Sequence, residues 1–519
     1  MNKLRAAIIA ALFLFAGTIG PGEAQDVSLT SRDGGVKIEG TLLGFDGTFY
    51  RVQTIYGELT LDGTGVTCKG PGCPDLENFV AEFIISGART MGETLMPALV
   101  QGFAAEQGYS VKRLVQDDTH FKFELRTGEG VLVARIGFRV TSSDEGFADL
   151  LADEADMALS LREVRRDEVK RGREAGLGNL GAAGRSRVIA LDGLTPITAP
   201  ENPVKEMSLQ TLAEVFGGKI RNWSALGGPD QPITLHMRSA ESGLWQAFED
   251  QVLDVAEEQL AGEAVRYGSN ADLADAVARD PFALGITSFS EVGNAERVAL
   301  KGSCGFRVPQ TRLTLKAEDY PLTAPMFLYT PARRLPQLAR DFLRYMRAPR
   351  AQIVIRRMGF VDQAPVEMEI ARQGERFANA IASAGDEVSL AELQAMVARL
   401  SGLRRLTTTF RFRGGSADLD PQSRSNAEQL ARALEAGIYD DREIVFVGFS
   451  DGMGAAGLNK RLARTRARAV RDAVLRAAPT ADQARLKMSV DAFGEALPMA
   501  CDDTVWGRQV NRRVEVWVR

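Results

Sequence analysis

Strand-like and helix-like segments alternate along the chain from about residue 79 to residue 368. RVIALDGLTPITA has the pattern of a buried strand, SLQTLAEVFGG that of a helix, and QPITLHM that of another strand. Alternation of this kind is typical of a fold in which helices pack on the faces of a sheet. The segment 79–368 therefore predicts an α/β domain with a largely parallel sheet.

The length of the chain, 519 residues, exceeds what one hydrophobic core normally supports, so we expect two to four domains. Residues 25–78 contain short alternating runs around 36–42 and 50–54, which predict a small β domain. Residues 369–404 are rich in charge and in helix formers, and they predict a helical linker.

The last segment, 405–519, shows strand, helix, strand, helix and strand in succession, which predicts a compact α+β domain. Its closing run, 513–518, alternates between polar and apolar residues. Since successive side chains point to opposite faces of a sheet, this alternation is typical of a half-buried strand.

The first 24 residues have the features of a signal peptide. A basic start, Asn2-Lys3-Leu4-Arg5, precedes the apolar run AAIIAALFLFAG, and Gly22-Glu23-Ala24 resembles a small-x-small cleavage site. A transmembrane anchor is the alternative, but the apolar run is short for a bilayer. We therefore predict an exported, otherwise soluble protein that begins near Gln25.

The four cysteines suit an oxidising compartment. Cys68 and Cys73 bracket the turn Lys-Gly-Pro-Gly, which brings them within reach of a disulfide. Half of a metal site is the alternative, but no CxxC motif or histidine pair supplies the other half. We predict the bridge and expect no metal and no cofactor. The sequence leaves open whether Cys304 and Cys501 pair.

The stretch VFVGFSDG contains G-x-S-x-G after an apolar run, which is the setting of a nucleophile elbow. A serine nucleophile needs a base, almost always histidine, and in the hydrolase fold this histidine follows the serine. Both histidines, His120 and His236, precede Ser450. With no Walker motif either, the sequence predicts no enzyme and no catalytic residue. The net charge of −5 argues mildly against a nucleic-acid partner.

The C-terminal segment resembles the OmpA-like peptidoglycan-binding family. The resemblance is carried by the motifs TFRFRGGSADLD, VGFSDGMG, NKRLARTRARAV, FGEALP and NRRVEVWV. The family pattern is an Asp-Gly loop after a strand, followed by N-x-x-L-[SA]-x-x-R-A-x-x-V, and this chain matches it at Asn459, Leu462, Ala463, Arg466, Ala467 and Val470. It departs slightly, with Ala463 where serine is common and Ser450, in the loop, where threonine is common.

This resemblance implies a peptidoglycan site. Arg466 would hold the carboxylate, and Asp451 the ammonium, at the free end of meso-diaminopimelate in the stem peptide. One cation and one anion at a fixed separation recognise a zwitterion. Asn459 and Arg513 are carried over as further binding residues, although a structural role suits both equally. For Asp451 and Arg466 the alternative is an Asp turn and a fold-stabilising ion pair.

Three expected helix starts in the middle segment carry small hydroxyl residues, namely SGART at 86–90, TSSDE at 141–145 and RSAESG at 238–243. Ser142 and Glu145 form a capping box. Free backbone N–H groups at helix starts, with hydroxyls and an arginine, can bind an anion. Each start taken alone is also an ordinary helix cap.

The middle segment resembles the phosphate-binding proteins of ABC transport systems, which have a type II periplasmic-binding-protein fold of two lobes that close over an oxyanion. The motifs that carry this resemblance are SGARTMGETLMPAL, ADMALSLRE, ALDGLTPITAPENPV, LAEVFGGKIRNWSALGG and RSAESGL. The resemblance implies ligand contacts at Thr90, Ser142, Ser143, Asp156, Arg238, Ser242 and Gly243.

The family's R-x-D-x-S-G-T motif is changed here, since Ala240 replaces the acid and Leu244 the final threonine. Glu241 either takes over the acid's role or repels an anion. Phosphate is therefore the predicted ligand, with another small oxyanion or a lost ligand as alternatives.

The predicted fold class is multidomain: a small N-terminal β unit, a two-lobed α/β domain of the type II periplasmic-binding-protein kind, and a C-terminal α+β OmpA-like domain. We expect a Gram-negative periplasmic protein at the cell wall, near the outer membrane, that binds peptidoglycan and phosphate or a similar oxyanion. An ABC permease or an envelope protein would be its partner.

The main alternative is a structural adaptor whose solute-binding domain has lost its ligand and contacts partner proteins. An enzyme or sensor that uses the same cleft is a further alternative. For that role the sequence offers only Asp156 and Glu241 as reactive groups.

Overall fold

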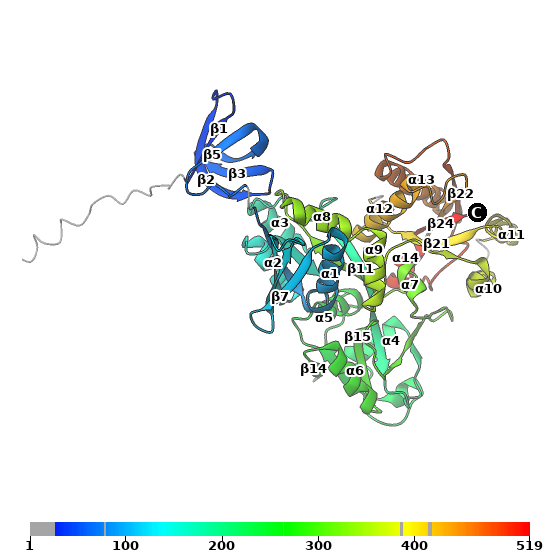
Figure 1. Cartoon of the computed structure of the whole chain (residues 1–519). Coiled ribbons are helices and arrows are strands. Elements are labelled where there is room, and N and C mark those ends of the chain that lie inside the picture. Colours follow the sequence, from blue (N-terminus) through cyan, green and yellow to red (C-terminus); the bar gives the residue numbers. More distant parts are fainter. Residues whose placement is uncertain (1–25, 77–78, 263, 383, 385–387, 414–417) are drawn as a thin grey trace, which may run out of the picture.

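The computed structural model describes residues 26–519, apart from 77–78, 263, 383, 385–387 and 414–417. The predicted signal peptide, 1–24, lies outside these residues. The described chain forms an N-terminal sheet, a two-lobed middle domain and a C-terminal domain, so the predicted fold class is confirmed (Figure 1). Among the described helices, none is both long enough and apolar enough to cross a membrane.

The N-terminal domain is a five-stranded antiparallel sheet in the order β4-β3-β2-β1-β5. Its small core includes the fully buried Tyr50 and Val52. A disulfide joins Cys68 to Cys73, whose Cα atoms are 5.9 Å apart. The strands are β1 (Val27–Ser31), β2 (Lys37–Phe45), β3 (Phe49–Thr54), β4 (Gly57–Asp62) and β5 (Val66–Lys69).

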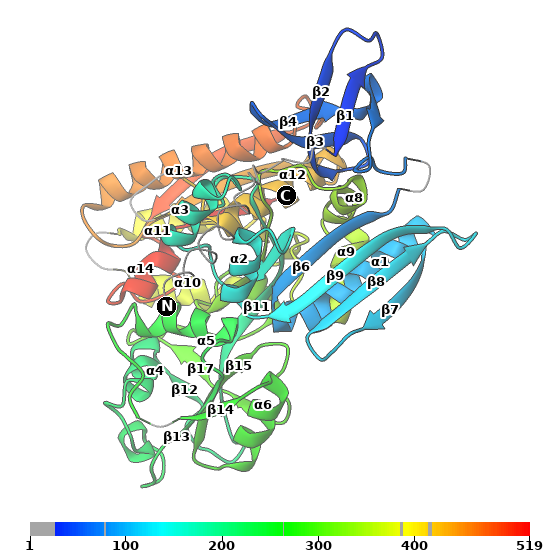
Figure 2. The ribbon, with the colours of Figure 1, turned by 90° about the vertical axis from the view of Figure 1, so that its left-hand side faces the viewer.

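One side chain, Asp46, fastens this sheet to the middle domain. Its carboxylate accepts hydrogen bonds from Arg334 Nε at 2.5 Å and from Arg340 Nη1 at 2.8 Å. Its carbonyl accepts from the backbone N–H of Gln337, the first residue of α8 (Gln337–Tyr345), at 2.9 Å. The sheet is therefore held at the start of α8 (Figure 2).

A long strand, β11 (Ser186–Thr198), connects the two lobes of the middle domain. Its first part pairs with β19 (Thr323–Tyr329) and its last part with β15 (Ala283–Ser288). All but its first two residues are buried. One sheet therefore runs through both lobes, in the order β14-β13-β15-β11-β19-β10-β6-β9-β8-β7.

The first lobe contains the strands from β19 to β7 in this order, and its sheet is mixed. The prediction of a largely parallel sheet is wrong here, because β7, β8 and β9 follow one another antiparallel and β19 is antiparallel to both neighbours. Short turns join β7 to β8 and β8 to β9, where parallel strands would need longer crossovers. Its further elements are β6 (Ala81–Ala88), η2 (Met91–Leu95), α1 (Met96–Gln107), β7 (Ser110–Val115), β8 (His120–Arg126), β9 (Leu132–Thr141), α2 (Ser143–Leu151), β10 (Met157–Ser160), α3 (Arg166–Glu174) and α9 (Pro349–Arg357).

The second lobe packs helices on a short parallel group in which β13 lies between β14 and β15. The NWSAL run forms a short helix, η3 (Trp223–Leu226), with Asn222 as its cap and Gly227 in a left-handed conformation at its end. Trp223 is fully buried there and donates to the carbonyl of Phe282 at 2.9 Å. The lobe's other elements are β12 (Glu206–Met207), α4 (Leu209–Phe216), β13 (Thr234–Arg238), α5 (Gly243–Phe248), η4 (Glu249–Leu253), β14 (Val265–Tyr267), α6 (Asn270–Arg279), β16 (Glu296–Arg297), β17 (Ala299–Lys301), β18 (Arg307–Val308) and α7 (Arg312–Lys316).

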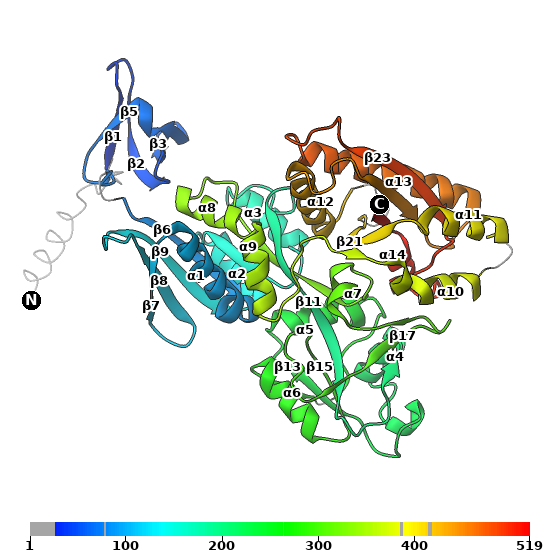
Figure 3. The same ribbon diagram turned by 45° about the vertical axis from the view of Figure 1, so that its right-hand side comes forward.

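The C-terminal domain is a sheet in the order β20-β21-β24-β22-β23 with helices on both faces (Figure 3). The segment predicted as a linker forms α10 and α11, and its Leu393 and Met396 share a core with Val445 and Trp517. These helices are therefore a structural layer of the domain. The elements are β20 (Glu367–Met368), η5 (Ile370–Gln373), α10 (Gly374–Ala382), α11 (Leu390–Leu400), β21 (Arg404–Phe410), α12 (Pro421–Glu435), β22 (Glu443–Phe449), α13 (Ala456–Ala477), β23 (Lys487–Gly494), α14 (Val505–Asn511) and β24 (Val514–Val518).

Because both faces are covered, every residue of β24 is buried, and the prediction of a half-buried closing strand is wrong. Glu515 consequently lies in the core, where its carboxylate is 2.7 Å from Arg513 Nε, 2.7 Å from Arg376 Nη2 and 3.3 Å from Arg405 Nε. Burial alone would raise the pKa of Glu515, but the three guanidinium groups hold this pKa well below its usual range.

The C-terminal domain is joined to both lobes of the middle domain. On the second lobe, a disulfide links Cys304 to Cys501, whose Cα atoms are 5.7 Å apart. On the first lobe, Arg347 Nη2 lies 2.7 Å from the carboxylate of Glu428 in α12. Between these points, Arg405 meets the carboxylate of Asp319 with two hydrogen bonds of 2.6 and 2.7 Å.

We expect Glu515→Gln to lower the free energy of unfolding of the C-terminal domain by about 3–5 kcal/mol, because it leaves three buried guanidinium groups without their shared anion. Urea titration followed by tryptophan fluorescence measures this loss.

The matched control is Glu443→Gln, since Glu443 also pairs with an arginine, Arg399 at 2.7 Å, but is 30% exposed. Its loss should stay below about 1 kcal/mol, as is usual for an exposed pair. Equal losses in the two variants would show that the buried charge cluster stabilises the domain no more than an exposed ion pair does.

Candidate functional site

Asp451 and Arg466 lie close together in the C-terminal domain, at the end of β22 and on the inner side of α13. A glycine sets this arrangement, since a Cβ atom on Gly448 would lie 2.1 Å from the carbonyl oxygen of Ala463. Only glycine lets α13 approach β22 so closely. The close approach carries the inner side of α13 against the strand end, and Asp451 follows that end by two residues.

Arg466 is 9% exposed, and its Nε and Nη1 atoms have no hydrogen-bond partner among the described residues. Its guanidinium lies 5.3 Å from the centre of the Phe412 ring. Burial lowers the pKa of Arg466, and so does nearby Arg512, whereas Asp451 opposes the shift. Leaving a charged donor buried without an acceptor costs free energy, so Arg466 is a candidate anion-binding group of this domain.

Asp451 is 8% exposed, and its Oδ2 accepts a hydrogen bond from Arg512 Nη1 at 2.6 Å. Sequence reasoning missed Arg512 and selected its neighbour Arg513 in the motif NRRVEVWV. Both arginines lie in the short connection between α14 and β24, where Arg512 is the C-cap of α14. The side chain of Arg513 is buried, whereas that of Arg512 lies beside Asp451.

Arg513 lies apart from this site. It is fully buried, donates to Glu515 and to the carbonyls of Leu497 and Asn511, and lies over the ring of Phe449. Burial lowers its pKa to about 10. These contacts give Arg513 a role in holding the fold.

Asn459 is 7% exposed on α13, and its Nδ2 donates to the carboxylate of Glu495 at 3.0 Å. Glu495 belongs to the FGEALP motif and is the first residue after β23. Asn459 therefore ties the first turn of α13 to the loop after β23, near the end of β22.

The predicted anion-binding helix starts of the middle domain are well formed. Ser142 caps α2, with its hydroxyl accepting from Glu145 N at 3.1 Å and its own N–H donating to the Glu145 carboxylate at 3.3 Å, so the predicted capping box is present. Ser242 caps α5 by accepting from Trp245 N at 3.1 Å. Both hydroxyl oxygens therefore already accept a backbone N–H.

The starts of α2 and α5, from different lobes, come into contact. A Cβ atom on Gly243 would lie 2.5 Å from Ser143 Oγ and 3.2 Å from Leu161 Cβ. Ser143 Oγ accepts from Leu161 N at 3.1 Å. The structure thus brings Ser143 and Gly243 together, but the buried side chain of Leu161 packs against the start of α5, and the next residue of the helix is the buried Leu244.

Thr90 and Arg238 line a pocket of about 90 Å³ between the two lobes. The guanidinium of Arg238 is largely engaged, since it donates to the carbonyls of Tyr267 and Gly268 at 3.2 and 2.6 Å and to Asn270 Oδ1 at 2.6 Å. Burial lowers its pKa.

Two carboxylates, those of Glu93 and Glu291, line the same pocket. Glu93 pairs with Arg89, and Glu291 accepts from Asn270 Nδ2 at 2.6 Å. The pocket therefore presents charges of both signs. Sequence reasoning missed Glu93 and Glu291, and no motif signal singles out either residue.

Asp156 lies elsewhere, at the start of β10. Its Oδ2 accepts from the backbone N–H of Ile84 at 2.8 Å, and its Oδ1 accepts from Arg333 Nη2 at 2.9 Å. Burial raises its pKa. Its contacts hold β10 beside β6. The seven residues predicted to bind an oxyanion thus fall into separate places: the Thr90 and Arg238 pocket, the helix starts at 142–143 and 242–243, and Asp156.

Two family models match the chain. Residues 79–350 match the PBP superfamily domain, and residues 411–512 match the OmpA family. The first match covers more than half of the chain and the whole of the second lobe. The second match contains Asp451, Asn459 and Arg466.

Among curated proteins, the phosphate-binding protein PstS of Borreliella burgdorferi is 21% identical over 232 residues, which are 44% of this chain and 79% of that protein. PstS of Bacillus subtilis is 32% identical over 160 residues, which are 31% of this chain and 51% of that protein. The chain therefore spans about half the length of the Bacillus protein.

Among solved structures, an ABC-type phosphate transport receptor from Vibrio cholerae is 20% identical, with a TM-score of 0.42. The match covers 54% of this chain and 99% of that structure.

We expect Arg466→Met to raise the free energy of unfolding of the C-terminal domain by about 1–3 kcal/mol, because it replaces a buried, unpaired charge with an apolar side chain. Arg513→Met in the same sheet should lower that free energy by about 3–5 kcal/mol, since Arg513 is paired with Glu515. Urea titration of both variants measures the difference. A loss of stability in both would make Arg466 an ordinary structural residue.

Proposed function

Because the chain belongs to the PBP superfamily and carries an OmpA-family domain after it, we propose that it is a cell-envelope protein anchored non-covalently to peptidoglycan through that second domain. The observation that carries this proposal is the buried guanidinium of Arg466, with two unpaired nitrogens, in the electrostatic reach of Asp451. The free end of meso-diaminopimelate in a stem peptide carries the carboxylate and the ammonium that these two side chains would meet.

The chemistry of this pair accounts for selectivity. A carboxylate would take charge-assisted hydrogen bonds from the free donors of Arg466. An ammonium would share Asp451 with Arg512, which already donates to it at 2.6 Å. A simple acid or a simple amine leaves one of the two buried charges without its partner, and this costs free energy.

We place the protein in the Gram-negative periplasm, at the cell wall. Two disulfides, one of which joins separate domains, suit an oxidising compartment. An ABC permease or another envelope protein would be the partner of the middle domain.

For the middle domain, the names of the PstS relatives suggest phosphate or a similar oxyanion. This proposal is supported by the meeting of Ser143 and Gly243 at two helix starts and by Arg238 in the interlobe pocket.

The second candidate is an adaptor that has lost its ligand and contacts other envelope proteins. It is favoured by the apolar Leu161 against the start of α5 and by the carboxylates of Glu93 and Glu291 in the pocket of Arg238. A multiply charged anion gains little where carboxylates already face the arginine. We therefore regard the adaptor as the better supported of the two.

Anchorage is tested by sedimenting the full-length protein with purified sacculi. Over a series of sacculi concentrations, Asp451→Asn and Arg466→Met should each raise the apparent Kd at least about tenfold, in keeping with the loss of a charge-assisted contact of about 1.5–3 kcal/mol. Free meso-diaminopimelate should compete.

The control is Arg468→Met, which removes an exposed arginine two residues along the same helix and should leave binding unchanged. Undiminished retention of the Asp451 and Arg466 variants would remove the proposed site.

Isothermal titration of the full-length protein with phosphate, sulfate and tungstate, after any copurified ligand has been stripped, decides between the two candidates for the middle domain. The adaptor predicts no heat with any of the three anions. Saturable heat that is abolished by Arg238→Gln would instead establish the oxyanion receptor.

A further inference from the structure

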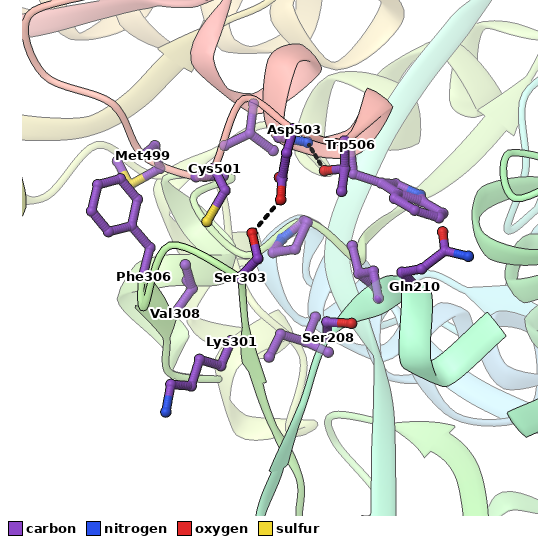
Figure 4. A pocket seen from close by; sticks show the side chains of 18 of the residues that line it. Ser208, Gln210, Lys301, Ser303, Phe306, Val308, Met499, Cys501, Asp503 and Trp506 are labelled. Carbon is purple, nitrogen blue, oxygen red and sulfur yellow. Dashed lines mark hydrogen bonds between the residues drawn. The ribbon is translucent and has the colours of Figure 1, made fainter. Parts of the chain in front are cut away.

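An apolar cavity of about 290 Å³ lies where the middle and C-terminal domains meet. Leu300, Phe306 and Val308 line it from the second lobe, and Met499, Trp506 and Val510 line it from the C-terminal domain. Figure 4 shows Phe306, Val308 and Met499 on one side, Trp506 on the other, and Cys501 between them. The disulfide between Cys304 and Cys501 joins the two domains at the wall of this cavity.

Every charged side chain that lines the cavity already has a partner within the chain. Lys301 Nζ lies 2.6 Å from the carboxylate of Glu206, Asp319 meets Arg405, and Asp503 accepts from the hydroxyl of Ser303. A charged ligand would lose its hydration without gaining a counter-charge. The cavity therefore suits a neutral molecule.

The aromatic lining is also without a free hydrogen-bond donor. Trp506 Nε1 donates to the carbonyl of Gln251 at 2.7 Å, so the indole offers the cavity its apolar surface. Phe306 adds a second ring on the facing domain. Aromatic rings gain from offset or edge contacts with another ring beyond the burial of area.

We propose that this interdomain cavity binds a neutral, mainly apolar small molecule, with a fused aromatic or branched aliphatic body. An apolar cavity of about 150 Å³ holds one benzene molecule, so this volume corresponds to about 10–12 non-hydrogen atoms. The site is separate from the interlobe pocket of Arg238 and from the pair Asp451 and Arg466, and it does not depend on the proposed function.

Because of the position of the cavity, a bound ligand affects how firmly the two domains are held together. Since its walls come from two domains, a bound molecule contacts both and stabilises their docked arrangement by mass action. Ligand binding therefore strengthens the contact between the middle domain and the C-terminal domain, and the extent of binding depends on that contact being formed.

The test uses naphthalene, which is neutral and has ten carbon atoms, with the full-length oxidised protein. We expect saturable binding by fluorescence titration and a rise in melting temperature. Naphthalene-2-sulfonate, which has the same ring system with a charge, should bind at least tenfold more weakly.

Two variants fill the cavity from opposite walls, Val510→Phe from the C-terminal domain and Val308→Phe from the half-exposed β18. Each should weaken naphthalene binding at least tenfold. Ile353→Phe is the matched control, because it adds a ring at a 42% exposed position on α9, and it should bind as the parent does. Non-saturable uptake, or equal affinity in the parent and in a folded cavity-filling variant, would overturn the proposal.

Discussion

A buried charge must be paired or it is costly, and the C-terminal sheet is organised around this constraint. Glu515 sits at its centre with three arginines in contact, and one of these, Arg405, extends the cluster to Asp319 of the middle domain. Arg376 and Arg405 each have an Nε atom without a hydrogen bond, but both form ion pairs through the rest of the guanidinium. Arg466 has two such nitrogens, Nε and Nη1, which distinguishes it from the arginines around Glu515.

Contacts beyond this cluster join the C-terminal domain to both lobes of the middle domain. The C-terminal domain contacts the first lobe through Arg347 and Glu428, and through a hydrogen bond of 2.9 Å from Ser425 to Gln363. It contacts the second lobe through the Cys304–Cys501 disulfide. A domain fixed to both lobes resists their relative movement about β11, and this constraint fits an adaptor better than a receptor that opens and closes.

Local signals in the sequence predicted local structure. The capping box at Ser142 and the bridge between Cys68 and Cys73 both rest on short motifs whose geometry is set within one or two elements. The mixed sheet of the first lobe and the double burial of β24 could not be predicted in this way. They depend on which distant segment covers which face, and a strand's own residues do not encode that.

The misplaced arginine has the same cause. The motif NRRVEVWV offers two adjacent arginines, and only the folded chain shows that Arg513 is buried beside Glu515 and that Arg512 donates to Asp451. Likewise, Leu161 is an ordinary apolar residue in its motif, and only the meeting of two lobes places it against Gly243.

The disulfide between Cys304 and Cys501, 197 positions apart, makes the intervening chain a closed covalent ring. This ring contains α8 and α9 of the first lobe and most of the C-terminal domain. An envelope protease that cuts the backbone once anywhere inside the ring leaves both fragments attached to each other. Shedding the C-terminal domain therefore takes reduction of the bridge as well as a cut, or else a second cut.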